Sequence, residues 1–96
     1  MQKRKIISSR QAEIDIENMA NYILFKLCNI QAAIKFKTLI NNTIQILSLS
    51  PRLGTVYRDN IYIFKLKKYS ILYLFTNNFI KILRVFHNRQ NISKQF

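Results

Sequence analysis

The chain has 96 residues, enough for one domain over residues 1–96 with a single modest core. Sixteen lysine and arginine residues against four acidic residues give a formal net charge of +12, which indicates a polyanionic or acidic partner. The single cysteine, Cys28, excludes a disulfide framework and a cysteine-based metal site. We expect Cys28 to be a small core residue in a reducing cytoplasm, and we expect no metal and no cofactor.

The N-terminal segment does not have the pattern of a secretion signal. MQKRK is basic, but the residues that follow turn polar and acidic before any apolar run. The longest apolar runs, YILF and ILYLF, are far shorter than the roughly 18 residues that a membrane span requires. These features predict a cytoplasmic protein with no membrane partner.

Two amphipathic helices are predicted in the first half of the chain, over residues 9–27 and 30–48, because apolar residues recur there at helical spacing. The two apolar stripes are Ala12, Ile16, Met19, Ile23 and Leu27, and Ala33, Phe36, Ile40, Ile44 and Leu47. Three acidic residues, Glu13, Asp15 and Glu17, fall near the start of the first helix. We expect them to be solvated and to complement the helix dipole rather than to bind a metal.

Beyond Gly54 the pattern changes from helical to alternating. Pro51 ends the second helix, and Gly54 supplies the freedom for a turn. Breaks at KK and TNN predict strands over residues 60–66, 69–76 and 79–87, joined by tight turns and therefore antiparallel. KRKII is a candidate first strand. The predicted fold is α+β: an N-terminal strand and a helical hairpin packed on a small antiparallel sheet, in the order β-α-α-β-β-β.

This order of elements, together with three short segments, resembles the ParE/RelE superfamily of toxins from bacterial type II toxin-antitoxin operons. The segments are the helix end SPRLG, the strand YSILYLF and the last strand ILRVFHNRQN, and the resemblance covers residues 5–93. It implies a ParE/RelE-like fold and a partner in the form of an acidic, partly disordered antitoxin. The net charge of +12 agrees with such a partner.

The resemblance implies one of two activities. RelE-type members resemble ribosome-dependent ribonucleases, in which an arginine or histidine acts with a tyrosine on the messenger RNA. ParE-type members resemble poisons of DNA gyrase, which need a binding surface. Ser70 stands where RelE-type sequences carry a catalytic arginine, and the ending NRQNISKQF has no tyrosine. We therefore favour gyrase as the partner and keep the ribosome and messenger RNA as the alternative.

Catalytic residues are expected only if the chain is a ribonuclease, and the candidates are then His87, Arg84 and Arg89. A histidine is the usual general acid or base near neutral pH, and the arginines would stabilise charge on the phosphate. A histidine at the end of a strand more commonly makes a local hydrogen bond. We expect that structural role for His87.

The candidate contacts for the target or for nucleic acid are Arg52, Arg58, Lys65, Lys67, Lys68, Tyr73 and Lys81. We expect the basic residues between positions 52 and 68 to gather around one edge of the sheet. The tyrosines of the second half of the chain are expected to be half-buried with hydroxyls in water. A third hypothesis is a basic nucleic-acid-binding module, although the chain lacks an RNA-binding sheet signature.

Overall fold

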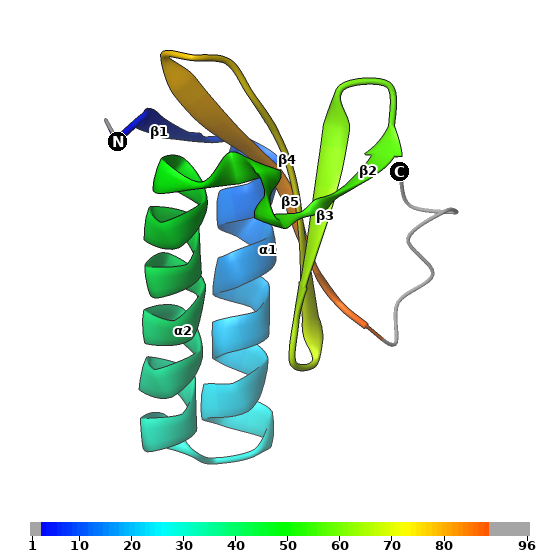
Figure 1. Cartoon of the computed structure of the whole chain (residues 1–96). Helices are drawn as coiled ribbons and strands as arrows, with labels where there is room; N and C mark the ends of the chain where they lie inside the picture. The colour runs from blue at the N-terminus through cyan, green and yellow to red at the C-terminus, as the bar shows by residue number, and fades with distance from the viewer. Residues whose placement is uncertain (1–2, 89–96) are drawn as a thin grey trace.

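The protein is described over residues 3–88 by a computed structural model, in which two helices lie against one face of a twisted five-stranded sheet (Figure 1). The helical segments are α1 (Arg10–Asn21), the π-helical turn η1 (Tyr22–Lys26), α2 (Ile30–Leu49) and the 3-10 turn η2 (Pro51–Leu53). The strands are β1 (Lys5–Ser8), β2 (Thr55–Arg58), β3 (Ile61–Leu66), β4 (Tyr69–Phe75) and β5 (Phe79–His87). The predicted α+β fold with an N-terminal strand and a helical hairpin is confirmed.

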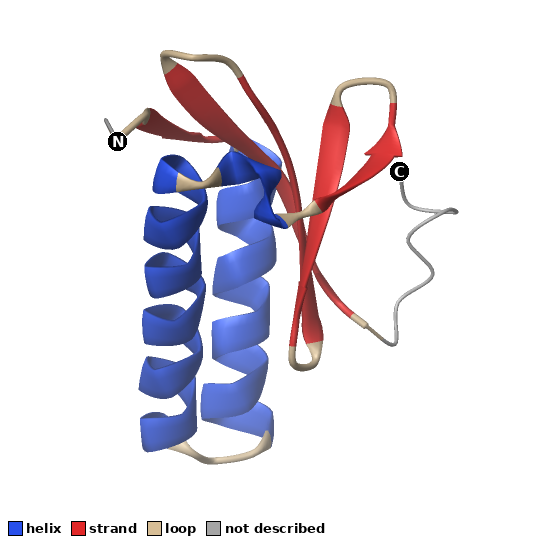
Figure 2. Cartoon of the chain, in the orientation of Figure 1, coloured by secondary structure: helices blue, strands red, loops and turns tan. Residues whose placement is uncertain are grey.

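The sheet differs from the prediction at its two edges (Figure 2). Its order is β1-β5-β4-β3-β2, and β3, β4 and β5 are antiparallel neighbours as expected. β1 pairs with β5 in parallel, so the sheet is mixed. β2 is an additional strand that the prediction did not include. It has four residues and an irregular register against β3, and so short a segment carries no clear alternation.

The helical hairpin follows the predicted stripes closely in α2 and less closely in the first helix. All five residues of the α2 stripe are buried, and Asn29 caps this helix by accepting a hydrogen bond from Ala32 N at 2.9 Å. Ser9 caps α1 in the same way through Ala12 N at 3.0 Å. The first helix gives way to the π-helical turn after Asn21, and Leu27 is exposed. The stripe therefore overestimated the length of the regular helix.

Cys28 lies in the connection between the two helices and is exposed. Its backbone has φ 51°, in the left-handed region, and its thiol lies 3.6 Å from the carbonyl oxygen of Phe25. The expectation that Cys28 is a core residue is therefore wrong. The reason is that the chain reverses direction here, at the tip of the hairpin and away from the sheet (Figure 1).

Position 54 requires glycine because there is no room for a side chain, not because the backbone needs an unusual conformation. Its φ of -75° and ψ of 176° are open to any residue, which corrects the sequence interpretation. A Cβ atom at this position would lie 2.3 Å from the hydroxyl oxygen of Tyr73 and 2.7 Å from the carbonyl oxygen of Ile63. The backbone thus passes directly over the buried end of the Tyr73 side chain.

The sheet separates two apolar clusters. The larger lies between the helices and the sheet and includes Leu47, Ile71 and Val85. The smaller lies on the opposite face around Leu72 and Phe86. Successive residues of a strand point to opposite faces, so β4 and β5 contribute to both clusters and are the most buried strands of the sheet.

Candidate functional site

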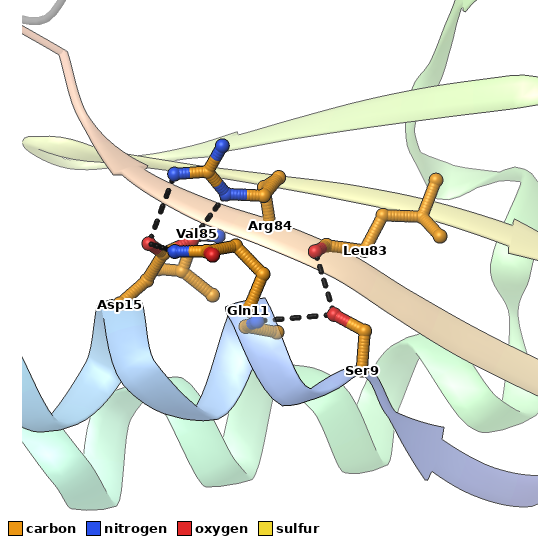
Figure 3. A network of polar contacts seen from close by, with 7 residues as sticks. Ser9, Gln11, Asp15, Leu83, Arg84 and Val85 are labelled. Atoms are coloured by element: carbon orange, nitrogen blue, oxygen red, sulfur yellow. Dashed lines mark hydrogen bonds and ion pairs between the residues drawn. The ribbon is translucent and has the colours of Figure 1, made fainter. Parts of the chain in front are cut away.

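The second half of β5 is covered by α1 instead of by another strand. β1 pairs with β5 only as far as Ile82, so the residues that follow in β5 pair with β4 on one side and have no strand on the other. The Ser9 hydroxyl donates a hydrogen bond to the carbonyl oxygen of Leu83 at 2.8 Å, and the Val85 N–H donates to Asp15 Oδ2 at 3.0 Å (Figure 3). Side chains of α1 thus satisfy the open edge of β5, which would otherwise be free to pair with another strand.

Arg84 is engaged by the same carboxylate. Its Nε and Nη2 donate to the two oxygens of Asp15 at 2.7 and 3.0 Å, and Gln11 adds a hydrogen bond at 3.1 Å (Figure 3). Asp15 is only 8% exposed, so the expectation of a solvated carboxylate is wrong for this residue. The hydrogen bond to Asp15 raises the pKa of Arg84. The guanidinium also lies 4.7 Å from the centre of the Phe86 ring.

This arrangement gives Arg84 a structural role. Its charge is compensated by a bidentate carboxylate, and its side chain is mostly buried. A residue that stabilises a developing charge on phosphate needs donors directed at the substrate instead. The pairing with Asp15 therefore weighs against the candidate catalytic role of Arg84, which stays a prediction. The sequence carried no signal of the pair, because its two members are far apart in the chain.

His87 and Tyr69 meet across β5 and β4. Their rings are 5.6 Å apart at 86°, an edge-on contact, and Tyr69 also packs against Phe36 at 4.9 Å. Burial raises the pKa of the Tyr69 hydroxyl. Both His87 and Tyr69 are half-buried. The local structural role of His87 stays a prediction that this packing favours.

Asn88 fastens the turn between β3 and β4 to the end of β5. Its side-chain amide donates to the carbonyl oxygen of Lys67 at 2.9 Å, and its backbone N–H donates to that of Lys68 at 2.6 Å. Ser70 is fully buried, and its hydroxyl donates to Asn88 Oδ1 at 2.6 Å. Sequence reasoning missed Asn88, because its partners lie about two strands earlier in the chain. Its position directly after the last predicted strand was the only signal.

The predicted basic residues between positions 52 and 68 lie on or next to β2 and β3, the two strands at one side of the sheet, but at different ends of these strands. Lys65, Lys67 and Lys68 are exposed at the end of β3 and in the turn that follows it. Arg58 is exposed at the opposite end of β3, where β2 turns into it. Arg52 is exposed in η2, outside the sheet. The basic residues therefore do not form one compact cluster, because consecutive hairpin turns lie at opposite ends of the strands.

Arg52 has a basic neighbour that sequence reasoning missed. The guanidinium groups of Arg52 and Arg4 each lie 5.6 Å from the centre of the Phe75 ring. Arg4 also donates a hydrogen bond to the carbonyl oxygen of Thr76 at 2.7 Å. The parallel pairing of β1 brings Arg4 there, and no local pattern in the sequence indicates it. Lys81, on β5, is half-buried.

Tyr73 is fully buried, which contradicts the prediction that it contacts a target. Its hydroxyl donates to the carbonyl oxygen of Pro51 at 2.5 Å and accepts from the N–H of Gly54 at 3.0 Å. Burial raises its pKa, although the hydrogen bond from Gly54 acts in the opposite direction. Tyr73 thus fastens the segment after α2 to the sheet. The remaining candidate, Arg89, lies outside the described residues.

The tip of the helical hairpin presents apolar side chains to the surface. Tyr22, Phe25, Leu27, Ile30 and Ile34 are all exposed, Phe25 by 71%. A shallow hollow at this tip is lined by Ala20, Asn21, Leu24, Ile30, Ala33, Ile34 and Lys37. Contiguous apolar surface of this kind is typical of a docking site for another protein.

Two features are absent from residues 3–88. In this range no group of three or more histidine, cysteine, aspartate or glutamate residues is placed to hold a metal ion. None of the helices described here combines the length and the apolar character needed to cross a membrane.

Comparison with known proteins gives one family and several similar structures. The model of the ParE toxin of type II toxin-antitoxin systems (parDE) matches residues 6–92. The structure of the chromosomal ParDE system from P. aeruginosa is 17% identical, with a TM-score of 0.76 over 88% of this chain and 96% of that one. The RelBE2 toxin-antitoxin complex from Mycobacterium tuberculosis is 18% identical, with a TM-score of 0.66 over 90% and 99%. Among curated proteins no relative matches.

Proposed function

The chain belongs to the ParE toxin family of type II toxin-antitoxin systems, and on this basis we propose that it inhibits growth by poisoning DNA gyrase and that a cognate antitoxin neutralises it. In this proposal the chain acts in the cytoplasm by binding. It has no nuclease chemistry of its own.

The burial of Ser70 is the observation that carries the choice of gyrase over messenger RNA. Ser70 stands where the RelE-type resemblance places a catalytic arginine. It is fully buried and donates its hydrogen bond to Asn88. A phosphate could not approach this side chain without opening the sheet. Arg84, on the neighbouring strand β5, is held by Asp15 and does not replace the missing group.

The alternative, ribosome-dependent cleavage of messenger RNA, is supported by the contact between His87 and Tyr69. A histidine beside a tyrosine is the kind of pair that RelE-type chemistry uses for protons. Lys65, Lys67 and Lys68 are exposed at the same end of the sheet and could neutralise a phosphate. Because burial raises the pKa of the Tyr69 hydroxyl, this group stays protonated near neutral pH and is available as a donor, not as a base. This pair would then depend on His87 as the base.

Two surface properties support an antitoxin partner. The net charge of +12 favours binding of an acidic chain. The tip of the hairpin has exposed apolar side chains, whose burial by a partner would be favourable. The two matched structures are toxin-antitoxin systems by their descriptions. We therefore propose that the antitoxin covers apolar surface of the helices together with basic surface of the sheet.

The test is to induce the chain alone in bacteria and to measure growth and two molecular outputs. We expect growth to stop, gyrase-linked DNA breaks to accumulate and a DNA-damage response to follow, while messenger RNA on ribosomes stays intact. The variant His87→Ala should keep these effects, and Asn77→Ala, in the exposed turn between β4 and β5, is the matched control. Prompt cleavage of messenger RNA that disappears in His87→Ala would contradict gyrase poisoning and support the ribonuclease alternative.

A negative result on growth needs a second measurement. Folded, soluble chain that leaves growth unaffected would contradict the toxin activity itself. If a short acidic reading frame lies next to the one for this chain, its co-expression should restore growth. Restored growth without a complex between the two purified chains would contradict neutralisation by binding.

A further inference from the structure

The turn between β3 and β4 carries a lysine in a backbone conformation that favours glycine. Leu66 pairs with Tyr69, so the turn consists of Lys67 and Lys68 alone. Lys67 has φ 52°. In two-residue hairpin turns, positions with positive φ are usually occupied by glycine, asparagine or aspartate, because a Cβ atom crowds the backbone there.

The surrounding structure holds this unfavourable conformation in place. The Asn88 side chain binds the carbonyl oxygen of Lys67, and the Asn88 N–H binds that of Lys68. The buried hydroxyl of Ser70 in turn fixes the Asn88 side chain. Strained backbone that is held from outside is commonly found where a side chain serves a function. Here the side chain in question is a lysine.

The charge around this turn is of one sign. Lys67, Lys68 and the neighbouring Lys65 are exposed. Of the acidic residues, Asp59 lies in the turn at the opposite end of β3, and the others, Glu13, Asp15 and Glu17, lie on α1. Two adjacent lysines on a fixed turn therefore face solvent without a carboxylate in the same turn.

The same region offers contacts for phosphates rather than for bases. Tyr69 is the aromatic residue next to the turn, but its ring is packed against Phe36 and His87. Proteins that bind single strands stack bases on accessible aromatic rings. With this ring occupied, the turn suits a ligand whose phosphates are exposed and whose bases are already stacked, which is duplex nucleic acid.

We propose that Lys67 and Lys68 form a preset contact for the phosphodiester backbone of duplex DNA, with Asn88 as the residue that positions them. This contact rests on the proposed function, in which the toxin acts on an enzyme that holds DNA. A fixed pair of charges suits a rigid ligand, because little freedom is lost on binding. A disordered acidic peptide adapts to mobile lysines and needs no preset turn.

The variant Lys67→Gly separates the binding role of the turn from its role in folding. Glycine removes the strain, so we expect the thermal midpoint to stay the same or to rise. We expect the affinity for a short fluorescent DNA duplex to fall about eightfold at 0.1 M salt. The slope of log K against log salt should become less negative by about 0.9, because one phosphate contact is lost. A lysine with no function in this turn would give the stability gain without the loss of affinity.

Asp59→Gly is the matched control for this substitution. Asp59 also has positive φ, 49°, in the neighbouring turn of the same sheet. Glycine relieves strain there as well, but it removes a negative charge, so affinity for the duplex should stay equal or increase. A fall in affinity in both variants would identify the turns as structural and would contradict the proposal.

The variant Asn88→Ala tests positioning. It should lower the affinity of the otherwise unchanged chain for the duplex and cause a smaller loss in the Lys67→Gly background, where only Lys68 is left for Asn88 to position. Hydrogen exchange of the turn amides should increase at the same time. Equal losses in both backgrounds would show that Asn88 contacts DNA by itself or acts elsewhere, and would overturn its positioning role.

The identity of the ligand is decided by two further measurements. Single-stranded RNA of the same length should bind more weakly than the duplex and should respond less to Lys67→Gly. If Lys67→Gly instead weakens the antitoxin complex and leaves duplex binding unchanged, the turn is a protein contact and the proposal is wrong. These assays use the purified chain without gyrase, so gyrase poisoning can fail while the DNA contact holds, and the reverse.

Discussion

Arg84 and Asp15, 69 positions apart in the chain, form a bidentate pair that joins the last strand to the first helix. The same carboxylate accepts a hydrogen bond from the N–H of Val85, so one side chain binds both a mostly buried guanidinium and the open edge of β5. Breaking such a pair on one side leaves the other partner buried and uncompensated. The cost of removing one side therefore exceeds the net contribution of the pair to stability.

We predict that Asp15→Ala lowers the free energy of unfolding by about 3 kcal/mol. The substitution leaves both the Arg84 guanidinium and the Val85 N–H without their hydrogen-bond acceptor. Asp15→Asn should cost less, because the amide oxygen can still accept hydrogen bonds. The matched control is Glu17→Ala, which breaks the ion pair with Lys37. That pair has the same 2.7 Å separation but exposed side chains, and its loss should cost about 0.5 kcal/mol or less. Urea denaturation measures all three, and equal losses for both pairs would contradict the structural role of Asp15.

The double variant Asp15→Asn/Arg84→Met tests whether Arg84 has a role in toxicity. It removes both charges together, so no lone charge remains buried at the junction of α1 and β5. We expect a folded chain of lower stability that still produces gyrase-linked DNA breaks when it is induced. Circular dichroism and a thermal midpoint confirm folding before the assay. Loss of the breaks in a demonstrably folded chain would place Arg84 in the target contact.

Gly54→Ala is predicted to lower the free energy of unfolding by about 1–3 kcal/mol through overpacking. Its Cβ would meet the Tyr73 hydroxyl at 2.3 Å and the Ile63 carbonyl at 2.7 Å. In a Tyr73→Phe background the hydroxyl is absent, so the cost of the same substitution should be smaller but not zero. Chemical denaturation of the two single variants and the double variant gives the coupling. Strict additivity would show that the two side chains do not compete for this space.

The buried tyrosine also predicts how stability depends on alkaline pH. Burial raises the pKa of Tyr73 above its ordinary value, so the folded chain keeps this proton when the unfolded chain loses it, from about pH 10 upward. The free energy of unfolding should then fall as pH rises above about 10, whereas the contribution of Tyr73 is fully present below that pH. Tyr73→Phe should be less stable at neutral pH, having lost two hydrogen bonds, but should show a shallower alkaline decline.

Urea denaturation at a series of pH values measures this slope, with Tyr22→Phe as the control because Tyr22 is exposed. Part of the decline should remain in Tyr73→Phe, since burial also raises the pKa of Tyr69. An identical alkaline slope in Tyr73→Phe and in the unchanged chain would contradict the assignment.

The periodicity of the sequence determined the parts of the fold that depend on local burial. All five apolar residues of the α2 stripe are buried, and the breaks at KK and TNN fall where the chain turns between strands. Helical spacing and alternation record which face of an element meets the core, and this information lies within a few residues. The family resemblance was likewise carried by short segments in a fixed order, and the family match over residues 6–92 confirms it.

Only the tertiary structure decided which polar groups meet. Asp15 looked like one of three solvated acids, yet it alone faces the edge of β5, because β1 ends at Ser8 and leaves that edge to α1. Tyr73 was predicted to be half-buried with its hydroxyl in water, yet the segment after α2 passes over this hydroxyl and buries it. Asn88 holds the turn between β3 and β4, about twenty residues earlier in the chain, through a hydrogen bond to the carbonyl oxygen of Lys67. Hydrogen bonds between distant segments depend on the register and direction of strands, which a local pattern does not encode.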